Sequence, residues 1–438
     1  MMSQQLKIAV VGSDQYNLDL IRAVPGSDSW ELLPVLTKEQ VQPRNERIDF
    51  DALLSEARQI IDSYGQPDAI IGHLDFPVCS LVALLQKEFD LPGASPKAVA
   101  RCEHKYRMRE IQKQVWPDRT PEVTAINPFA PDEALCTAPP YPFWLKPVKG
   151  HSSVLGFIIE DKKDFTEAMH VCRQKIHLIG APFNQFLAHI EEESLSADVD
   201  GNFLVAEEPI DADRQFTLEG YVFQGETQIY AAVDSLRGGR RKSSFSRFQY
   251  PADLPKSVMD RTLEDTKLIM RQIGYDNAPF NIEFFWNPET DNLQILEINP
   301  RISKSHSPLF HMVDGASQHK VAIDLALGRK PDMPQRQGRE EIAAKFVLRS
   351  FEADGLIRHV PTQEEIDALE RLLPDIEFNV LVRNGDQLTQ LPFQESYSFE
   401  LAELFLGGSN EEMLEDAYLR CLHSLPILIQ PLPAPAPS

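Results

Sequence analysis

The sequence predicts an α/β fold at the N-terminus followed by α+β regions, in a chain of 438 residues that can form two or three packed domains. Strand and helix signals alternate through the first hundred residues, which is typical of a parallel sheet covered by helices. Further along, several strand signals follow one another before the next helix signal, and this pattern is α+β. Proline- and glycine-containing breaks separate the regions.

The N-terminal unit is expected to span residues 1–95. Each of its apolar strand patterns precedes a helix pattern: 7–11 before a helix after residue 14, 31–36 before 50–64, and 69–72 before 78–89. Ligands of such sheets collect beyond the carboxyl ends of the strands. Asp14, His73 and Asp75 would lie there, although a plain turn role is the alternative interpretation for most residues at this edge.

The middle of the chain mixes strands and helices. Ser95 and Pro96 are typical of an N-cap and the first residue of a helix, and that helix is expected to carry Lys105. An apolar strand at 141–148 contains Lys146. The other expected strands are 157–160, 203–205, 216–223 and 228–232, and the expected helices are 162–176 and 256–272, the latter closed by Gly274.

The C-terminal unit, residues 336–430, is expected to be α+β. It begins with a strand at 343–350, and a capping box of Thr362 and Glu365 opens a helix. Asn384-Gly385 is a hairpin signal. A second capping box, Ser409 with Glu412, is expected to open the final helix, and the Pro/Ala-rich residues 431–438 are expected to be disordered.

Composition restricts the partners. The formal charge of −23 would repel nucleic acid and anionic lipid, so we expect neither as a partner. No stretch approaches the ~20 apolar residues of a membrane span, and the N-terminus lacks a secretion signal. The five cysteines form no Cys-x-x-Cys pair, which favours buried free thiols. A cytoplasmic protein with small-molecule partners is expected.

The most informative segment is 281–306, where two strands rich in aromatic and branched residues flank a turn at 288–292. A five-residue turn that closes an antiparallel hairpin fixes which positions face each other. The expected pairs are Asn281 with Asn299, Glu283 with Glu297, and Phe285 with Ile295. The other face would carry the apolar residues Ile282, Phe284, Trp286, Leu296 and Ile298. A slip of one residue would put the two acids on opposite faces.

Two carboxylates that face each other at ~5 Å repel, so this hairpin needs a compensating charge. A hard divalent cation supplies it, because Glu283, Glu297 and the Asn299 carbonyl offer oxygen ligands and leave positions for phosphate and water. Arg301 could reach the same phosphates with its guanidinium. The alternative is an edge hairpin with solvated acids, which is the usual role of isolated Glu residues. The combination with Arg301 favours a magnesium and nucleotide site.

The string Glu297-Ile-Asn299-Pro-Arg301-Ile-Ser-Lys304-Ser resembles the metal-site signature of the ATP-grasp superfamily, in particular carbamoyl-phosphate synthetase, biotin carboxylase and L-amino-acid ligases. The resemblance covers residues 1–330, and more loosely the C-terminal unit. It implies an ATP-grasp fold in which a Rossmann-like domain at 1–95 precedes an ATP-grasp domain at 96–335. The two subdomains of the latter would meet at a hinge near 205–210, and a C-terminal α+β lobe would follow.

The resemblance also implies nucleotide contacts. Lys105 and Lys146 look like the two ATP-binding lysines, although Lys105 taken alone is more readily a solvated helix residue. Residues 149–156 take the place of the phosphate loop, with only two glycines, and position 215 holds Gln where many relatives have an acid or histidine for ribose. The implied ATP-binding residues are Lys105, Lys146, Lys149, Ser152, Ser153, Glu207, Glu208, Ile210 and Gln215.

The implied activity joins a small carboxylate to an amine. ATP and two Mg²⁺ ions, which Mn²⁺ could replace, would bind Glu283, Glu297 and Asn299 and allow phosphorylation of the carboxylate. The amine would attack the acyl phosphate, with the oxyanion stabilised by Arg301 and by Lys304 or His306. Homodimers are common among relatives with this C-terminal lobe, so a homodimer is compatible with the resemblance.

Two alternatives remain at this point. A biotin carboxylase-like enzyme would phosphorylate bicarbonate, and Arg349 is similar to an arginine of that lobe; however, the residues after Arg301 lack the acid that biotin carboxylases carry before their histidine. A protein that binds ATP without turnover would not need both Glu283 and Glu297. The loop containing Arg237, Arg240 and Arg241 is either solvated or contacts a substrate anion.

Overall fold

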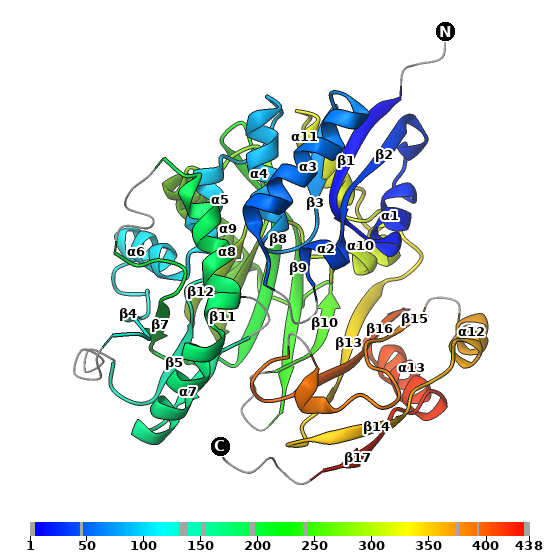
Figure 1. Cartoon of the computed structure of the whole chain (residues 1–438). Coiled ribbons are helices and arrows are strands. Elements are labelled where there is room, and N and C mark those ends of the chain that lie inside the picture. Colours follow the sequence, from blue (N-terminus) through cyan, green and yellow to red (C-terminus); the bar gives the residue numbers. More distant parts are fainter. Residues whose placement is uncertain are drawn as a thin grey trace. The chain divides into compact units, whose positions relative to one another are not determined.

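The computed structural model describes residues 5–43, 47–130, 139–150, 154–191, 198–239, 244–373, 376–391 and 394–432. The chain divides into two compact units. Figure 1 labels the helices and strands of both units. The first unit comprises Met1–Ala232, Leu254–Lys304 and Gln318–Met333. The second comprises Val233–Asp253, Ser305–Ser317 and Pro334–Ser438.

The first unit begins with the predicted parallel sheet, which confirms the α/β expectation. Strands β1 (Leu6–Ser13), β2 (Trp30–Thr37) and β3 (Ala69–Gly72) pair in parallel in the order β2-β1-β3. Both faces of β1 are buried, because helices cover both sides of such a sheet. The helices are α1 (Gln15–Arg22), α2 (Lys38–Val41), α3 (Phe50–Tyr64) and α4 (Val78–Glu88), with a 3₁₀ turn at Ser27–Ser29.

The helix expected to carry Lys105 is interrupted before that residue. Helix α5 (Pro96–Glu103) begins where predicted, with the Ser95 side chain accepting a hydrogen bond from the Ala98 N–H. It ends at Glu103, and the next residue, His104, has an extended backbone and a side chain that caps α6 (Lys105–Val115). Lys105 is therefore the first residue of α6, where its N–H is free to bond outside the helix.

A small antiparallel sheet follows. Its strands β4 (Val123–Ile126), β5 (Phe143–Pro147), β6 (Phe157–Ile159) and β7 (Leu204–Glu207) are ordered β4-β7-β5-β6. Helices α7 (Lys162–Lys175) and α8 (His177–Ala188) follow β6, and α7 packs on this sheet. Phe143 and Leu145 of β5 enter the core of this region, so Lys146 between Leu145 and Pro147 projects from the other face.

The remaining strands of the first unit are β8 (Arg214–Phe223), β11 (Ala278–Asn287) and β12 (Asn292–Asn299), together with the first part of β9 (Glu226–Gly238). Their order is β12-β11-β8-β9. One face is apolar and packs into the largest core of the unit. Helix α9 (Lys256–Ile273) ends at Gly274, as predicted, in the left-handed conformation with φ 75°. Helix α11 (His319–Ala326) completes the unit.

The second unit is α+β. The last part of β9, β10 (Ser244–Tyr250), β13 (Ile342–Ser350), β16 (Phe399–Gly408) and β15 (Ile376–Val380) are neighbours in that order. Strand β14 (Gly355–His359) pairs with β17 (Leu428–Pro431). The helices are α10 (Ser307–Asp314), α12 (Gln363–Leu372) and α13 (Glu411–Ser424), with a 3₁₀ turn at Leu388–Gln390.

Local signals of the second unit are confirmed in part. The Thr362/Glu365 capping box is present. The second predicted box is wrong, because Asn410 caps α13 by accepting a hydrogen bond from the Met413 N–H at 3.0 Å. Asn384-Gly385 forms a turn with Gly385 at φ 90°, but no strand begins directly after it. Residues 433–438 of the predicted tail lie outside the described residues.

The cysteines and the apolar content of the helices were both subjects of expectations from composition. Cys79, Cys102, Cys172 and Cys421 are buried and free, as expected, and Cys136 lies outside the described residues. In the described part of the chain, no helix has the length and apolar character that crossing a membrane requires.

Candidate functional site

The hairpin of β11 and β12 places Glu283 opposite Glu297 and Asn281 opposite Asn299, as predicted. The turn and the pairing next to it differ from the prediction. Asn287 pairs with Asn292, so the turn has one residue fewer than expected and the pairs next to it are shifted by one position. A β-bulge between the pairs Phe284–Ile295 and Glu283–Glu297 then adds a residue to β12 and restores the expected register.

The bulge changes which side chains face the core. Ile295 pairs with Phe284 rather than Phe285, and its side chain is buried in the core. Leu296 is the extra residue of the bulge and lines a pocket beside Glu297 instead of joining the apolar face. The predicted pairing of Phe285 with Ile295 and the predicted place of Leu296 on the apolar face were therefore wrong. Burial of the other predicted apolar side chains is confirmed for Ile282, Phe284, Trp286 and Ile298.

The face of the sheet opposite the core carries rows of polar residues. Strand β8 places Thr217 beside Glu283 and Glu219 beside Asn281. Gln215, two residues before Thr217, donates a hydrogen bond to Glu283 at 2.7 Å. Glu219 has no solvent exposure, and burial raises its carboxyl pKa well above the usual value. The sequence prediction missed Glu219, although an acid in an otherwise apolar strand was a usable signal.

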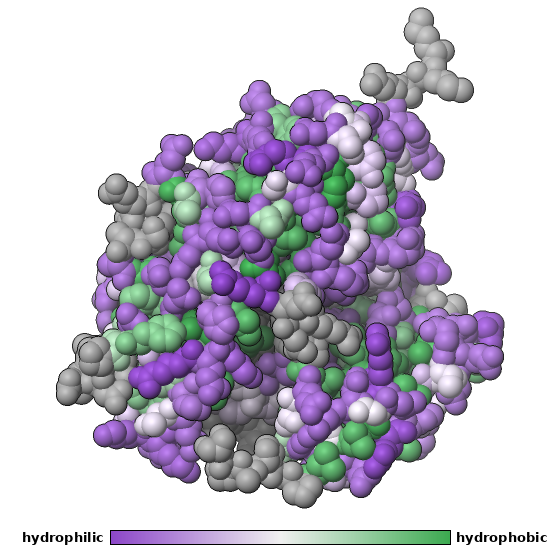
Figure 2. All heavy atoms as spheres, viewed as in Figure 1, coloured by the Kyte–Doolittle hydropathy of each residue, from purple (hydrophilic) through white to green (hydrophobic). Residues whose placement is uncertain are grey.

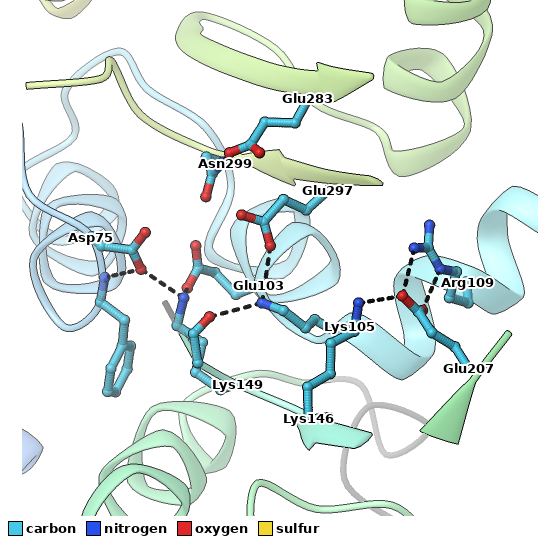
Figure 3. A network of polar contacts seen from close by, with 12 residues as sticks. Asp75, Glu103, Lys105, Arg109, Lys146, Lys149, Glu207, Glu283, Glu297 and Asn299 are labelled. Carbon is cyan, nitrogen blue, oxygen red and sulfur yellow. Dashed lines mark hydrogen bonds and ion pairs between the residues drawn. The ribbon is translucent and has the colours of Figure 1, made fainter. Parts of the chain in front are cut away.

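Lys105 lies against the acid pair. Its Nζ is 3.2 Å from Oε2 of Glu297 and donates to the Gly150 carbonyl at 2.8 Å (Figure 3). Burial would raise the pKa of Glu297, but Lys105 and Lys146 hold it at about 2. In this structure a lysine therefore compensates one of the two opposed acids.

Glu207, at the end of β7, is the centre of a second buried charge cluster. Its carboxylate accepts hydrogen bonds from Nε of Arg109 at 2.9 Å and from Nζ of Lys146. Arg109 also donates to the Ile295 carbonyl at 2.7 Å. Burial would raise the pKa of Glu207, but the two cations hold it at about 2. In this structure Glu207 is the anionic partner of Lys146. The sequence contained no signal for Arg109.

Lys149 and Arg301 meet at Asp75. Nζ of Lys149 is 2.7 Å from Oδ1 of Asp75 and also contacts the buried carboxylate of Glu103. The NH2 group of Arg301 donates to Oδ2 of Asp75 at 2.6 Å and to Oδ1 of Asn299 at 3.3 Å. Burial would lower the pKa of both cations, but the acids raise it. The edge of the N-terminal sheet thus contacts the residues after β12.

Many predicted site residues share one pocket of the first unit. Its lining brings together elements that are far apart in sequence: α5, α6, β5, β7 and β12. The predicted residues among those that line it are Lys105, Lys146, Lys149, Glu207, Glu297 and Asn299. Carboxylates and an amide oxygen on the polar face of the sheet are ligands that suit a hard divalent cation. The lysines beside them suit phosphate.

Other predicted residues are placed differently. Glu208 is exposed, and its N–H donates to the Glu122 carbonyl at 3.2 Å. Lys304 is exposed and Ile210 is partly exposed. His306 belongs to the second unit, where it is buried with its ring 5.3 Å from that of Phe248. Ser152 and Ser153 lie outside the described residues.

The arginines that sequence analysis left open belong to the second unit. Arg349 donates to the Phe245 carbonyl at 2.8 Å and to Glu395 at 3.0 Å, so its charge is compensated within the unit. The guanidinium carbon of Arg237 lies 4.1 Å from the ring centroid of Phe245. Arg240 and Arg241 lie outside the described residues.

Comparisons with known proteins agree with the sequence resemblance. The family model of the ATP-grasp domain matches residues 139–308. An uncharacterized protein of Sinorhizobium fredii is 22% identical over 359 residues, which are 80% of this chain and 68% of that protein. The carbamoyl phosphate synthase large chain of Ralstonia nicotianae is 24% identical over 330 residues, 73% of this chain. The match covers only 28% of that synthase.

Solved structures share the fold over almost the whole chain. An L-amino acid ligase from Bacillus licheniformis has a TM-score of 0.69 at 16% identity, covering 98% of this chain and 100% of that one. The biotin carboxylase domain of the Hydrogenobacter thermophilus 2-oxoglutarate carboxylase, solved with MgADP and bicarbonate, has a TM-score of 0.62 at 16% identity, covering 98% and 92%. At these identities the likeness establishes the fold alone.

Proposed function

Because the chain contains an ATP-grasp domain and has the ATP-grasp fold, and members of this family are ATP-dependent ligases, we propose that it activates a carboxylate with ATP and joins it to an amine. The observation that carries the proposal is the pairing of Glu283 with Glu297 on the polar face of the hairpin. Glu297 lines one pocket together with Lys105, Lys146 and Lys149, so the opposed acids would supply a metal site next to a phosphate site.

We assign the metal to Glu283, Glu297 and Asn299. These residues would hold two Mg²⁺ ions, or Mn²⁺ in their place, which supply charge neutralisation and orientation of the ATP phosphates when bound. In this proposal Lys105, Lys146 and Lys149 would compensate phosphate charge, and Ser152 and Ser153 would add hydrogen-bond donors. We assign the nucleoside part of ATP to Glu207, Glu208, Ile210 and Gln215.

The chemistry follows from the poor reactivity of a carboxylate. A carboxylate resists attack by an amine because it is anionic and would have to expel oxide, whereas an acyl phosphate expels phosphate. Arg301, held beside Asn299, is assigned to stabilise the negative charge that develops on the acyl oxygen during attack. Lys304 and His306 are assigned supporting roles in the same step.

The proposal includes the remaining expectations from the sequence. The protein would be cytoplasmic, would act on small molecules, and would have domain boundaries near residues 95 and 335. The residues after Arg301 lack the acid that biotin carboxylases carry before their histidine, which favours the ligase over a carboxylase.

One assay tests the proposal against its alternatives. ADP and phosphate release would be measured with MgATP and pools of amino acids, with MgATP, bicarbonate and biotin, and with MgATP alone. A ligase releases ADP only with the amino-acid pools and forms a product with a new C–N bond. Release only with bicarbonate and biotin would support the carboxylase, and tight ATP binding without release under any condition would support a binding protein.

A further inference from the structure

Asp75 occupies a fixed position at the carboxyl edge of the N-terminal sheet. Strand β3 ends three residues earlier, and α4 begins three residues later. The Asp75 carbonyl accepts a hydrogen bond from the Val78 N–H at 2.9 Å, and Oδ1 accepts one from the Phe76 N–H at 2.7 Å. The side chain is only 11% exposed. The backbone of this turn therefore fixes the direction of the carboxylate.

Each carboxylate oxygen of Asp75 holds a different cation. Oδ1 is 2.7 Å from Nζ of Lys149, whose side chain is 3% exposed. Oδ2 accepts two hydrogen bonds from Arg301, from NH2 at 2.6 Å and from Nε at 3.2 Å. These cations lie 74 and 226 residues away in the sequence. Asp75 thus connects Lys149, at the start of the segment that resembles the phosphate loop, to Arg301, within the segment that resembles the metal-site signature.

Among the described residues that accept hydrogen bonds from the Arg301 guanidinium, Asp75 is the charged one. The others are neutral: Oδ1 of Asn299 at 3.3 Å and the Ile302 carbonyl at 3.3 Å. A charged acceptor bonds an arginine more strongly than a neutral one and imposes a direction through its paired donors. Without Asp75, the two weaker bonds would have to orient a guanidinium that is 17% exposed.

We propose that Asp75 is a positioning residue of the ligase reaction, which keeps the Arg301 guanidinium beside Asn299 and so aims it at the reacting carboxylate. This inference rests on the proposed function. An ion pair with a purely structural role would contribute to folding stability but would not affect the turnover of the folded protein. The two roles therefore differ in what a substitution changes.

The Asp75→Asn variant separates these roles. Asn keeps the size of the side chain but removes its charge, so Arg301 loses its charged acceptor and the cluster becomes one unit more positive. We expect kcat to fall about 100-fold, as for a displacement of about 1 Å in a catalytic group. KM for MgATP should stay the same or decrease, because the added positive charge attracts phosphate. Asp75→Glu, which restores the charge one methylene further out, should recover part of kcat.

A double-mutant cycle tests whether Asp75 acts through Arg301. Asp75→Asn, Arg301→Ala and the double variant would be compared by kcat/KM. If Asp75 only positions Arg301, the double variant should be as active as Arg301→Ala. Additive losses would overturn the proposal. Asp265→Asn is the matched control, because Asp265 is 14% exposed and holds Arg119 through two hydrogen bonds of 2.9 Å.

A readout without turnover separates a failure of this inference from a failure of the proposed function. In the full chain labelled with ¹⁵N-arginine, the Nε–H signal of Arg301, assigned by its loss in Arg301→Lys, should exchange slowly with solvent. Asp75→Asn should speed that exchange at least tenfold, and Asp265→Asn should not. Unchanged exchange in Asp75→Asn would overturn the proposal, even in a protein that shows no ligase activity.

Discussion

Replacing Glu297 by glutamine is expected to lower kcat/KM for MgATP by about 100- to 1000-fold, the loss typical of removing a group that stabilises charge in a transition state. Glutamine preserves the size of the side chain but removes one of the two charged ligands that we propose for the metal. It also removes the acid that lies 3.2 Å from Nζ of Lys105. Steady-state ADP release at fixed free Mg²⁺ measures the effect.

The same hairpin offers a control for this substitution. Glu289 lies in the exposed turn between β11 and β12, so Glu289→Gln removes the same charge from the hairpin without touching the pocket. It should change kcat/KM less than twofold. Similar activities of the Glu297→Gln and Glu289→Gln proteins would mean that the opposed acids have no part in turnover.

The second large effect is on stability. Glu207→Ala should lower the free energy of unfolding by about 3–5 kcal/mol, because it leaves Arg109 and Lys146 without their shared anion in a buried cluster. Urea unfolding followed by tryptophan fluorescence measures the loss. Glu208→Ala is the matched control, since the next residue is exposed and should cost less than about 0.5 kcal/mol.

The stability difference between wild type and Glu207→Ala should depend on pH, because the pKa of Glu207 is low in the folded protein. Its pKa is about 2 in the folded protein and 4.5 ordinarily, so ionised Glu207 stabilises the fold. That contribution is complete above about pH 5 and is lost as the pH falls towards 2. The stability gap between wild type and Glu207→Ala should therefore shrink over this range. A gap that is constant from pH 6 to pH 3 would exclude an ionised Glu207 as its source.

Local patterns in the sequence predicted much of the fold. The alternation of apolar strands and helices predicted the parallel N-terminal sheet, and the capping residues Ser95 and Thr362 marked true helix starts. The opposed acids of the hairpin also followed from a local rule, the two-residue period of a strand. Their alignment depended on two departures that cancelled, a shorter turn and a bulge at Leu296.

Features that depend on distant parts of the chain could not be predicted. Arg109 reaches Glu207 across 98 residues, and Asp75 reaches Arg301 across 226 residues. No sequence periodicity encodes such pairs, because they arise only when separate elements pack together. The end of α5 before His104 was also missed, since it depends on a single extended residue rather than on a proline or glycine signal.

The most direct test of the account is to count divalent ions bound at the acid pair. Mn²⁺ binding would be titrated by electron paramagnetic resonance with and without ADP, in wild type and in Glu283→Ala, Glu297→Ala and Glu289→Ala. We predict that nucleotide increases Mn²⁺ binding to wild type and to Glu289→Ala, and that each of the other two substitutions abolishes this increase. Nucleotide-dependent Mn²⁺ binding that survives in both Glu283→Ala and Glu297→Ala would contradict the assignment of this hairpin as the metal site.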